Sequence, residues 1–237
     1  MEIIYIGLLT LVAATIGTMT GFGTSTIMIP ILAFFLPPVE AIFLVAIIHW
    51  FGDVWKVVLF RAGFQFKLIA LFGVAGLLAG FFGASLTLDI DQEILLRILG
   101  GFISLYALFL IFQKHFKIPA STMTALGGGA LSGFFAGIFG IGGAIRSMFL
   151  SAFDLPKTTY IATAGAIGLM VDATRIVTYF SGGTKLPAEL AYGLLFFIPL
   201  SFIGAKIAKL IVDKIPQEKF RLVVSGFLFL VGMTLIF

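Results

Sequence analysis

The order of apolar and polar positions predicts a chain that crosses a membrane many times. A membrane-spanning helix needs roughly 20 largely apolar residues, and several stretches of this length carry almost no charge. Each half of the chain contains one very long apolar run followed by three ordinary spans. These segments are 3–36, 38–62, 67–87 and 93–113 in the first half, and 120–153, 156–180, 189–212 and 217–237 in the second. The runs are continuously apolar rather than alternating, which favours helices over a β-barrel.

Composition narrows the class of protein further. Of the 237 residues, 60% are hydrophobic and 11% are charged, whereas an ordinary soluble domain has roughly 25% charged residues. This balance excludes a soluble enzyme, a nucleic-acid-binding domain and a disordered chain. Cysteine is absent, which removes disulfides, thiol nucleophiles and thiolate metal sites. The two histidines, His49 and His115, are far apart in the sequence, so we expect no metal site, and we expect no cofactor.

The chain repeats itself at a fixed offset. Residues 119 positions apart match as Gly21 with Gly140, Gly23 with Gly142, Pro37 with Pro156, Asp53 with Asp172, and Lys56 with Arg175. Glycine matches mean little in this composition, but an acid and a base at the same spacing mean more because charges are scarce. The matches predict two transmembrane repeats, 1–117 and 118–237.

Loop charges predict that the two repeats have opposite orientations. In the first half, basic loops at 61–67 and 114–117 enclose an acidic loop at 89–93. Basic loops lie on the cytoplasmic side, so the acidic loop is expected to be external. In the second half the bias reverses. The loop matching the first basic loop holds only Lys185 and Glu189, and the one matching the acidic loop holds Lys206, Lys209, Lys214, Lys219 and Arg221. Opposite bias in matched loops is typical of inverted repeats.

The long apolar runs supply the odd number of crossings that inversion requires. A straight helix of about 34 residues would measure about 51 Å, more than the roughly 30 Å of the hydrocarbon core. Each run is interrupted, by TGFGTS at 20–25 and by FGIGGA at 139–144. We therefore expect two broken helices folded back as hairpins, with both termini outside. The alternative is a single tilted, kinked helix in each half and eight spans arranged as parallel repeats.

The two breaks are candidates for anion binding. A broken helix exposes N–H groups and the positive end of a helix dipole, which favour anions, and glycine allows positive φ and close approach of a ligand. The candidate residues are Gly21, Phe22, Gly23, Thr24 and Ser25 in the first break, and Gly140, Ile141, Gly142 and Gly143 in the second, with Arg146 one turn further on. The alternative is that these glycines only permit tight helix packing.

Charged residues inside the spans form two matched pairs. Asp53 and Lys56 share a helix face with His49, and Asp172 and Arg175 repeat the acid–base spacing. One interpretation is an internal salt bridge that only stabilises the helix. The other gives Lys56, Arg175 and Arg146 an anion-attracting role and makes Asp53, Asp172 or His49 proton carriers.

These motifs resemble those of the sulfite exporter TauE/SafE family of membrane transporters. The matching segments are GFGTSTIMIPIL at 21–32 and GIFGIGGAIRSMFL at 137–150, and the resemblance extends over the whole chain in length, duplication and helix layout. Arg146 stands where the family usually has an apolar residue, and Thr24 and Ser25 stand where it often has glycines. The resemblance implies transport of a small sulfur-containing anion, such as sulfite or an organosulfonate.

Together these patterns predict an all-α, multi-pass protein of the cell (plasma or inner) membrane that is a secondary transporter, not an enzyme. Its partners would be a small anionic substrate and the lipid bilayer, with no nucleic acid. Alternating access between the repeats and proton coupling are further hypotheses. A passive small-anion channel, using the same basic residues, is the first alternative. An intramembrane enzyme and a membrane scaffold are weaker ones.

Overall fold

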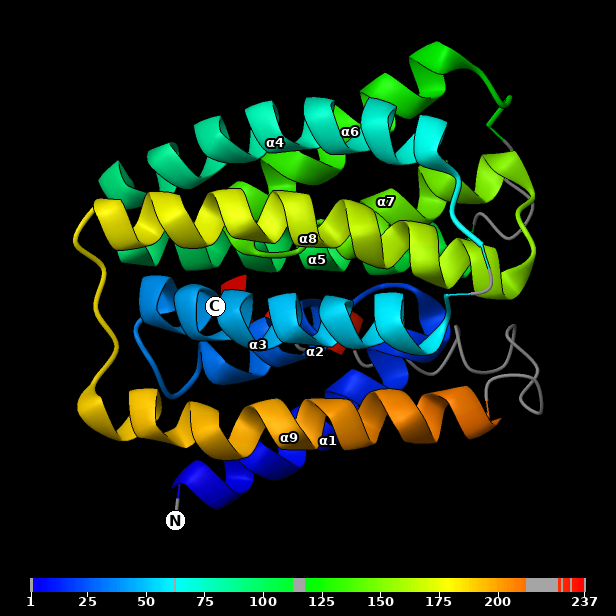
Figure 1. Cartoon of the computed structure of the whole chain (residues 1–237). Coiled ribbons are helices and arrows are strands. Elements are labelled where there is room, and N and C mark those ends of the chain that lie inside the picture. Colours follow the sequence, from blue (N-terminus) through cyan, green and yellow to red (C-terminus); the bar gives the residue numbers. More distant parts are fainter. Residues whose placement is uncertain are drawn as a thin grey trace.

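The computed structural model is a bundle of helices lying side by side (Figure 1). It describes residues 2–61, 63–112, 118–211, 226, 228–230 and 232–236. Within these ranges, 7 helices are long and apolar enough to cross a membrane. The long helices are α1 (Glu2–Thr20), α3 (Pro38–Leu59), α4 (Phe66–Asp89), α5 (Gln92–Phe112), α6 (Thr122–Phe139), α8 (Lys157–Ser181) and α9 (Ala188–Ile211). Two short helices, α2 (Ser25–Leu32) and α7 (Gly143–Leu150), and the 3-10 helix η1 (Ser151–Phe153) connect them.

The helix boundaries follow from the local sequence. Pro38 is the first residue of α3, and Pro156 immediately precedes α8. Proline is favoured at a helix start because its fixed φ suits the first turn, where a backbone N–H would have no partner within the helix. The Ser121 hydroxyl caps α6 by accepting a hydrogen bond from the Thr124 amide at 3.0 Å. Within the described residues up to Ile211, helices lie where the sequence predicts them, with ends that differ by a few residues. Most of the predicted span 217–237 lies outside the described residues, as do His115 and the basic residues at 114, 117, 214, 219 and 221.

Both long apolar runs are broken where the glycines predict. α1 ends at Thr20 and α2 begins at Ser25, while α6 ends at Phe139 and α7 begins at Gly143. The backbone φ is +75° at Gly21, +84° at Gly23 and +72° at Gly140. A residue with a Cβ is strained in this region, so the breaks depend on glycine.

The chain reverses direction at both breaks. A Cβ on Gly17 would lie 2.6 Å from the Thr24 amide nitrogen, so the first break folds back against the last turn of α1. A Cβ on Gly128 would lie 2.5 Å from the Phe149 Cβ. The end of α7 therefore lies beside an early turn of α6, and α7 runs back along that helix. Neither run is a single kinked helix.

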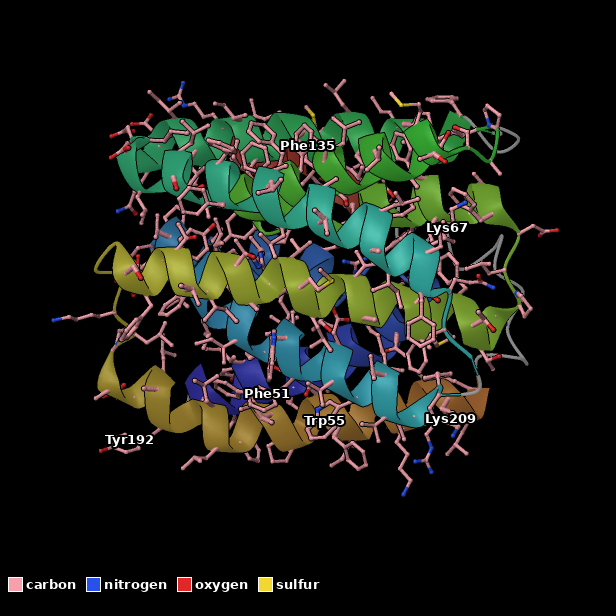
Figure 2. All side chains as sticks on the ribbon, turned by 45° about the horizontal axis from the view of Figure 1, so that its top comes forward. Phe51, Trp55, Lys67, Phe135, Tyr192 and Lys209 are labelled. Atoms are coloured by element: carbon pink, nitrogen blue, oxygen red, sulfur yellow. The ribbon has the colours of Figure 1, made fainter. Side chains whose placement is uncertain are left out.

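Matched helices of the two halves run in opposite directions in Figure 1. There α3 runs from left to right and α8 from right to left, while α4 runs from right to left and α9 from left to right. The two ends of the bundle also differ. Lys67 and Lys209 lie at one end, and Tyr192 lies at the other (Figure 2).

The closest helix packing joins one half of the chain to the other. A Cβ on Gly129 of α6 would lie 2.5 Å from the Phe72 carbonyl oxygen of α4, and one on Gly137 would lie 2.6 Å from the Ala84 amide. The two helices are thus parallel and in backbone contact. α1 and α9 pack in the same way, since a Cβ on Gly204 would lie 2.7 Å from the Leu11 carbonyl oxygen. Small residues allow such close approach in membranes.

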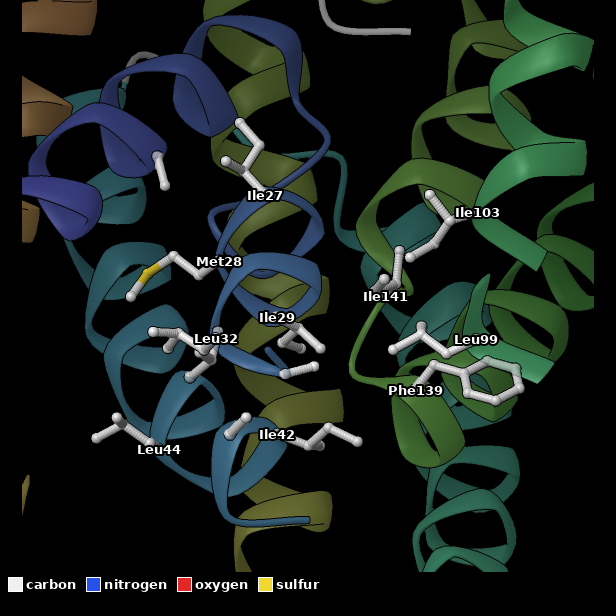
Figure 3. Close-up of a cluster of buried hydrophobic side chains, with 14 of the residues drawn as sticks. Ile27, Met28, Ile29, Leu32, Ile42, Leu44, Leu99, Ile103, Phe139 and Ile141 are labelled. Carbon is white, nitrogen blue, oxygen red and sulfur yellow. The ribbon is translucent and has the colours of Figure 1, made fainter. Parts of the chain in front are cut away.

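An apolar core surrounds the two breaks. In Figure 3, Ile29 of α2 and Ile42 of α3 lie on one side, and Phe139 and Ile141 at the second break lie on the other, beside Leu99 of α5. The outer faces are also apolar. Only 28% of the spanning window of α9 is buried, which is expected of a surface that faces lipid.

The α4–α6 contact predicts a stability difference between two glycines of α6. A Cβ on Gly133 would lie 2.5 Å from the Gly76 Cα, whereas one on Gly127 would meet nothing within 4 Å. We expect Gly133→Ala to destabilise the protein by about 1–3 kcal/mol through overpacking. The matched Gly127→Ala variant should melt at or above the wild-type temperature, because alanine favours helix. Thermal unfolding in detergent measures both. Equal melting temperatures for the two variants would contradict this packing.

Candidate functional site

The candidate site forms where α3 crosses α8. His49 Nδ1 lies 2.5 Å from Asp172 Oδ2, and a Cβ on Gly165 would lie 3.1 Å from the Lys56 Cβ. Late residues of α3 therefore meet early residues of α8, and the two helices are antiparallel. This crossing brings together acid–base pairs that are far apart in the sequence.

Each aspartate forms an ion pair on its own helix. Lys56 Nζ lies 2.6 Å from Asp53 Oδ1, and Arg175 Nε lies 2.8 Å from Asp172 Oδ1. His49 connects the two pairs, since its Nδ1 contacts Asp172 and its Nε2 lies 3.9 Å from Asp53 Oδ1. All five side chains are buried. The spacing that the sequence suggested therefore corresponds to two real ion pairs with an imidazole between them.

Arg146 has no such acidic partner within the part of the chain that the structure describes. It is only 4% exposed, and its Nε and Nη2 have no hydrogen-bond partner among the described residues. Its Nη1 and the Asp53 carboxylate both lie against Gly168 of α8. A Cβ on Gly168 would lie 3.1 Å from Nη1 and 2.8 Å from the Asp53 Cγ. Asp53 Oδ2 also has no hydrogen-bond partner in the described part of the chain. A buried guanidinium without a partner is costly, and a bound anion would remove that cost.

The two helix breaks touch one another. Ser147 Oγ of α7 donates to the Gly21 carbonyl oxygen at 2.7 Å, and a Cβ on Gly143 would lie 2.7 Å from the Phe22 carbonyl carbon. Tyr160 of α8 closes over the same place, because a Cβ on Gly21 would lie 2.8 Å from its ring. The breaks therefore lie side by side, as the sequence analysis expected.

The hydroxyl groups of the first break have different surroundings. Thr26 Oγ1 donates to the Phe22 carbonyl oxygen at 2.8 Å, so this hydroxyl is engaged within its own helix turn. Ser25 Oγ is buried and has no hydrogen-bond partner within the described ranges. A Cβ on Gly52 would lie 3.6 Å from Thr24 Oγ1, which places the Thr24 hydroxyl against α3. Ser25 is thus one buried hydroxyl of this break that has no partner in the described part of the chain.

The remaining residues of the breaks pack against apolar side chains, α6 and Arg175. The side chains of Phe22 and Ile141 belong to the apolar core, so they do not face a polar ligand. A Cβ on Gly142 would lie 2.6 Å from the Ala136 Cβ, and one on Gly140 would lie 2.8 Å from Arg175 Nη1. The second break therefore lies between α6 and the guanidinium of Arg175.

Three residues of the cluster are close enough to share a metal ion. One ligand atom from each of His49, Asp53 and Asp172 lies within 4.8 Å of the others, a grouping that the spacing of the two histidines did not suggest. However, Lys56 and Arg175 already lie at ion-pair distance from the two carboxylates. Their positive charges would repel a metal cation at this short range. The cluster suits a proton or an anion better than a metal.

Comparison with known families decides the class of protein. The family model described as "Sulfite exporter TauE/SafE" matches residues 6–235. The chain belongs to the sulfite exporter TauE/SafE family. No curated protein gives a significant match. The match to the TauE/SafE model includes both breaks and both ion pairs, and with the seven apolar helices it makes this chain a multi-pass membrane transporter.

Sequence reasoning missed three residues that shape the site in this TauE/SafE protein. Gly168 lies beside Asp53 and Arg146, while Ser147 and Tyr160 lie against Gly21. The internal repeat could have indicated Gly168. It stands 119 positions after His49, the same offset that relates the two aspartates.

Gly168 provides a test of the site geometry. We expect Gly168→Ala to reduce anion transport at least about tenfold, because its methyl group would collide with the Asp53 carboxylate and crowd Arg146. Gly52→Ala is the matched control, since its Cβ would meet only Thr24 Oγ1 at 3.6 Å, an ordinary contact. Uptake into proteoliposomes, normalised to the amount of reconstituted protein, measures both. Wild-type transport by Gly168→Ala would show that the space beside Asp53 is not used.

Proposed function

We propose that this protein is a secondary transporter that moves a small sulfur-containing anion, such as sulfite or an organosulfonate, across the cell membrane. The observation that carries the proposal is the buried guanidinium of Arg146, which has no partner among the described residues. Membership of the TauE/SafE family supports the choice of sulfur-containing anions. An oxyanion matches the planar, bidentate donor set of an arginine.

The substrate would bind between the breaks at Gly21–Ser25 and Gly140–Gly143. There α7 begins at Gly143, and the free N–H groups at its N-terminus favour an anion. Arg146, one turn later, supplies charge, and the unpartnered Ser25 hydroxyl supplies a hydrogen bond from the first break. Lys56 and Arg175 add positive potential while they remain paired with their aspartates.

Two inverted repeats would carry out alternating access. The opposite directions of α3 and α8, and of α4 and α9, support the inversion (Figure 1). Lys67 and Lys209 lie at the same end of the bundle (Figure 2), so this end would be cytoplasmic. The two repeats would move relative to each other at the α3–α8 crossing, and this movement would open the space between the breaks to one side of the membrane at a time. The hydrogen bond from Ser147 to Gly21 is one contact that would open.

Proton coupling would use the imidazole between the two carboxylates. His49 contacts Asp172 at 2.5 Å and lies 3.9 Å from Asp53. A histidine in this position can exchange a proton with either acid, and ionisable groups inside a membrane commonly form proton relays. Transport driven by a pH gradient would support this coupling, and flux that ignores the gradient would count against it.

Replacing Arg146 tests the proposed anion site. We expect Arg146→Gln to reduce counterflow of sulfite or methanesulfonate at least about a hundredfold, because the site would lose its excess positive charge. Arg97→Gln is the control, since Arg97 is exposed and pairs with Glu93 on the surface of α5. Counterflow in liposomes, with both variants reconstituted to the same density, measures the difference. Equal rates for Arg146→Gln and wild type would refute the site.

The absence of native cysteine allows a direct test of orientation. The exposed residues Lys67 and Lys185 would lie on opposite sides of the membrane. In intact cells, a membrane-impermeant maleimide should label Lys185→Cys but should reach Lys67→Cys only after permeabilisation. The wild-type chain, which has no cysteine, gives the background. Labelling of both variants from the same side would contradict the proposed topology.

A further inference from the structure

The two halves of the charged cluster differ at the position that holds His49 in the first half and Gly168 in the second. His49 and Gly168 stand 119 positions apart, as do Asp53 and Asp172. In one half this position holds an imidazole against Asp172. In the other half it holds only a glycine, and Arg146 lies near the space beside Asp53. His49 therefore contacts Asp172 directly and lies 3.9 Å from Asp53, while Arg146 lies on the Asp53 side of the cluster.

The buried charges of the described residues do not balance. Three cations, Lys56, Arg146 and Arg175, oppose two carboxylates, Asp53 and Asp172. With His49 neutral, the cluster carries one excess positive charge, and with His49 protonated it carries two. Each charge left uncompensated in this environment is costly.

The surroundings of His49 decide where an added proton would go. Its Nδ1 faces Asp172 at 2.5 Å, so the Nδ1 proton is donated to that carboxylate and Nε2 is the basic nitrogen. Nε2 is buried, has no hydrogen-bond partner within the described part of the chain, and lies 3.9 Å from Asp53 Oδ1.

Other groups face the imidazole from each neighbouring element. Lys56 of α3 and Arg175 of α8 pair with the two aspartates that flank the ring, and Arg146 of α7 lies on the Asp53 side. The backbone of the first break closes the remaining side, because a Cβ on Gly23 would lie 3.1 Å from the His49 Cε1. An additional negative charge in such a site favours a proton on a neighbouring basic nitrogen.

We propose that the site binds a monoanion as it stands, and that it binds a dianion only when His49 Nε2 also takes up a proton from water. Monoanionic oxyanions such as sulfonates would then bind alone, and dianionic oxyanions such as sulfite would bind as a proton–anion pair. The occupied site has the same net charge in both cases. This inference rests on the proposed anion site and assigns its charge selectivity to His49.

Calorimetry of the purified protein in detergent tests the proton count. Methanesulfonate is a monoanion and sulfate a dianion of similar size, and neither changes its own charge near neutral pH. Titrations at one pH in two buffers of different ionisation enthalpy give the protons taken up on binding. We expect about one proton for each sulfate and none for methanesulfonate, with sulfate affinity falling up to about tenfold for each pH unit of increase.

A variant of His49 locates the proton. Gln can donate to Asp172 but cannot be protonated, so His49→Gln should weaken sulfate binding at least about tenfold more than it weakens methanesulfonate binding. Proton uptake that persists in His49→Gln would overturn the assignment to this residue. If this variant binds neither anion because it misfolds, the proton count of the unmodified protein still decides.

The outcomes separate this inference from the proposed function. If the unmodified protein binds neither anion, the anion site itself is wrong. If it binds methanesulfonate but not sulfate at neutral or mildly acidic pH, or binds both without proton uptake, only the charge selectivity assigned to His49 is wrong.

Discussion

Charge inside a membrane is tolerated only when it is paired or used, and this constraint organises the molecule. The buried Asp, His, Lys and Arg residues of the described chain all lie around the crossing of α3 and α8, or on α7 beside it. Two of the three cations are neutralised within one turn of their own helix. Arg146 is not, and both helix breaks meet next to it. Glycines let the surrounding helices pack closely enough to keep lipid away from this cluster.

The breaks follow from a related constraint on the backbone. Peptide groups at membrane depth need partners, and a broken helix leaves some of them free unless they are buried in protein or face a wet cavity. Here the positive φ at Gly21 and Gly140 turns the backbone back on itself at each break. The Ser147 hydroxyl, beside the second break, donates a hydrogen bond to the Gly21 carbonyl oxygen in the first. Ser25 Oγ still has no partner in the described ranges. The same geometry therefore buries the break and leaves the Ser25 hydroxyl without a partner among the described residues.

The sequence predicted much of this arrangement because charge is scarce in it. Asp53, Lys56, Asp172 and Arg175 stand out in apolar surroundings, and their matched spacing implied both the duplication and the ion pairs. The parallel packing of α4 on α6 could not be predicted, since helices that are apolar on every side do not reveal which face meets which partner. Gly168 was missed because its importance is the space it leaves, which shows only once Arg146 and Asp53 are placed beside it.

The contacts of α4 with α6 and of α1 with α9 also bear on how such a chain came to exist. One helix of each half, α4 or α9, packs against helices of the other half. The helices therefore form two groups in space, α1, α2, α3 and α9 in one and α4, α6, α7 and α8 in the other (Figure 1). A half expressed alone would expose the glycine-lined groove that its missing partner fills. An ancestor with a single repeat would therefore have had to assemble as an antiparallel dimer that exchanged these helices. Fusion of two such copies would make that exchange intramolecular and would leave each copy free to diverge, as the imidazole of His49 and the glycine at the matched position 168 do.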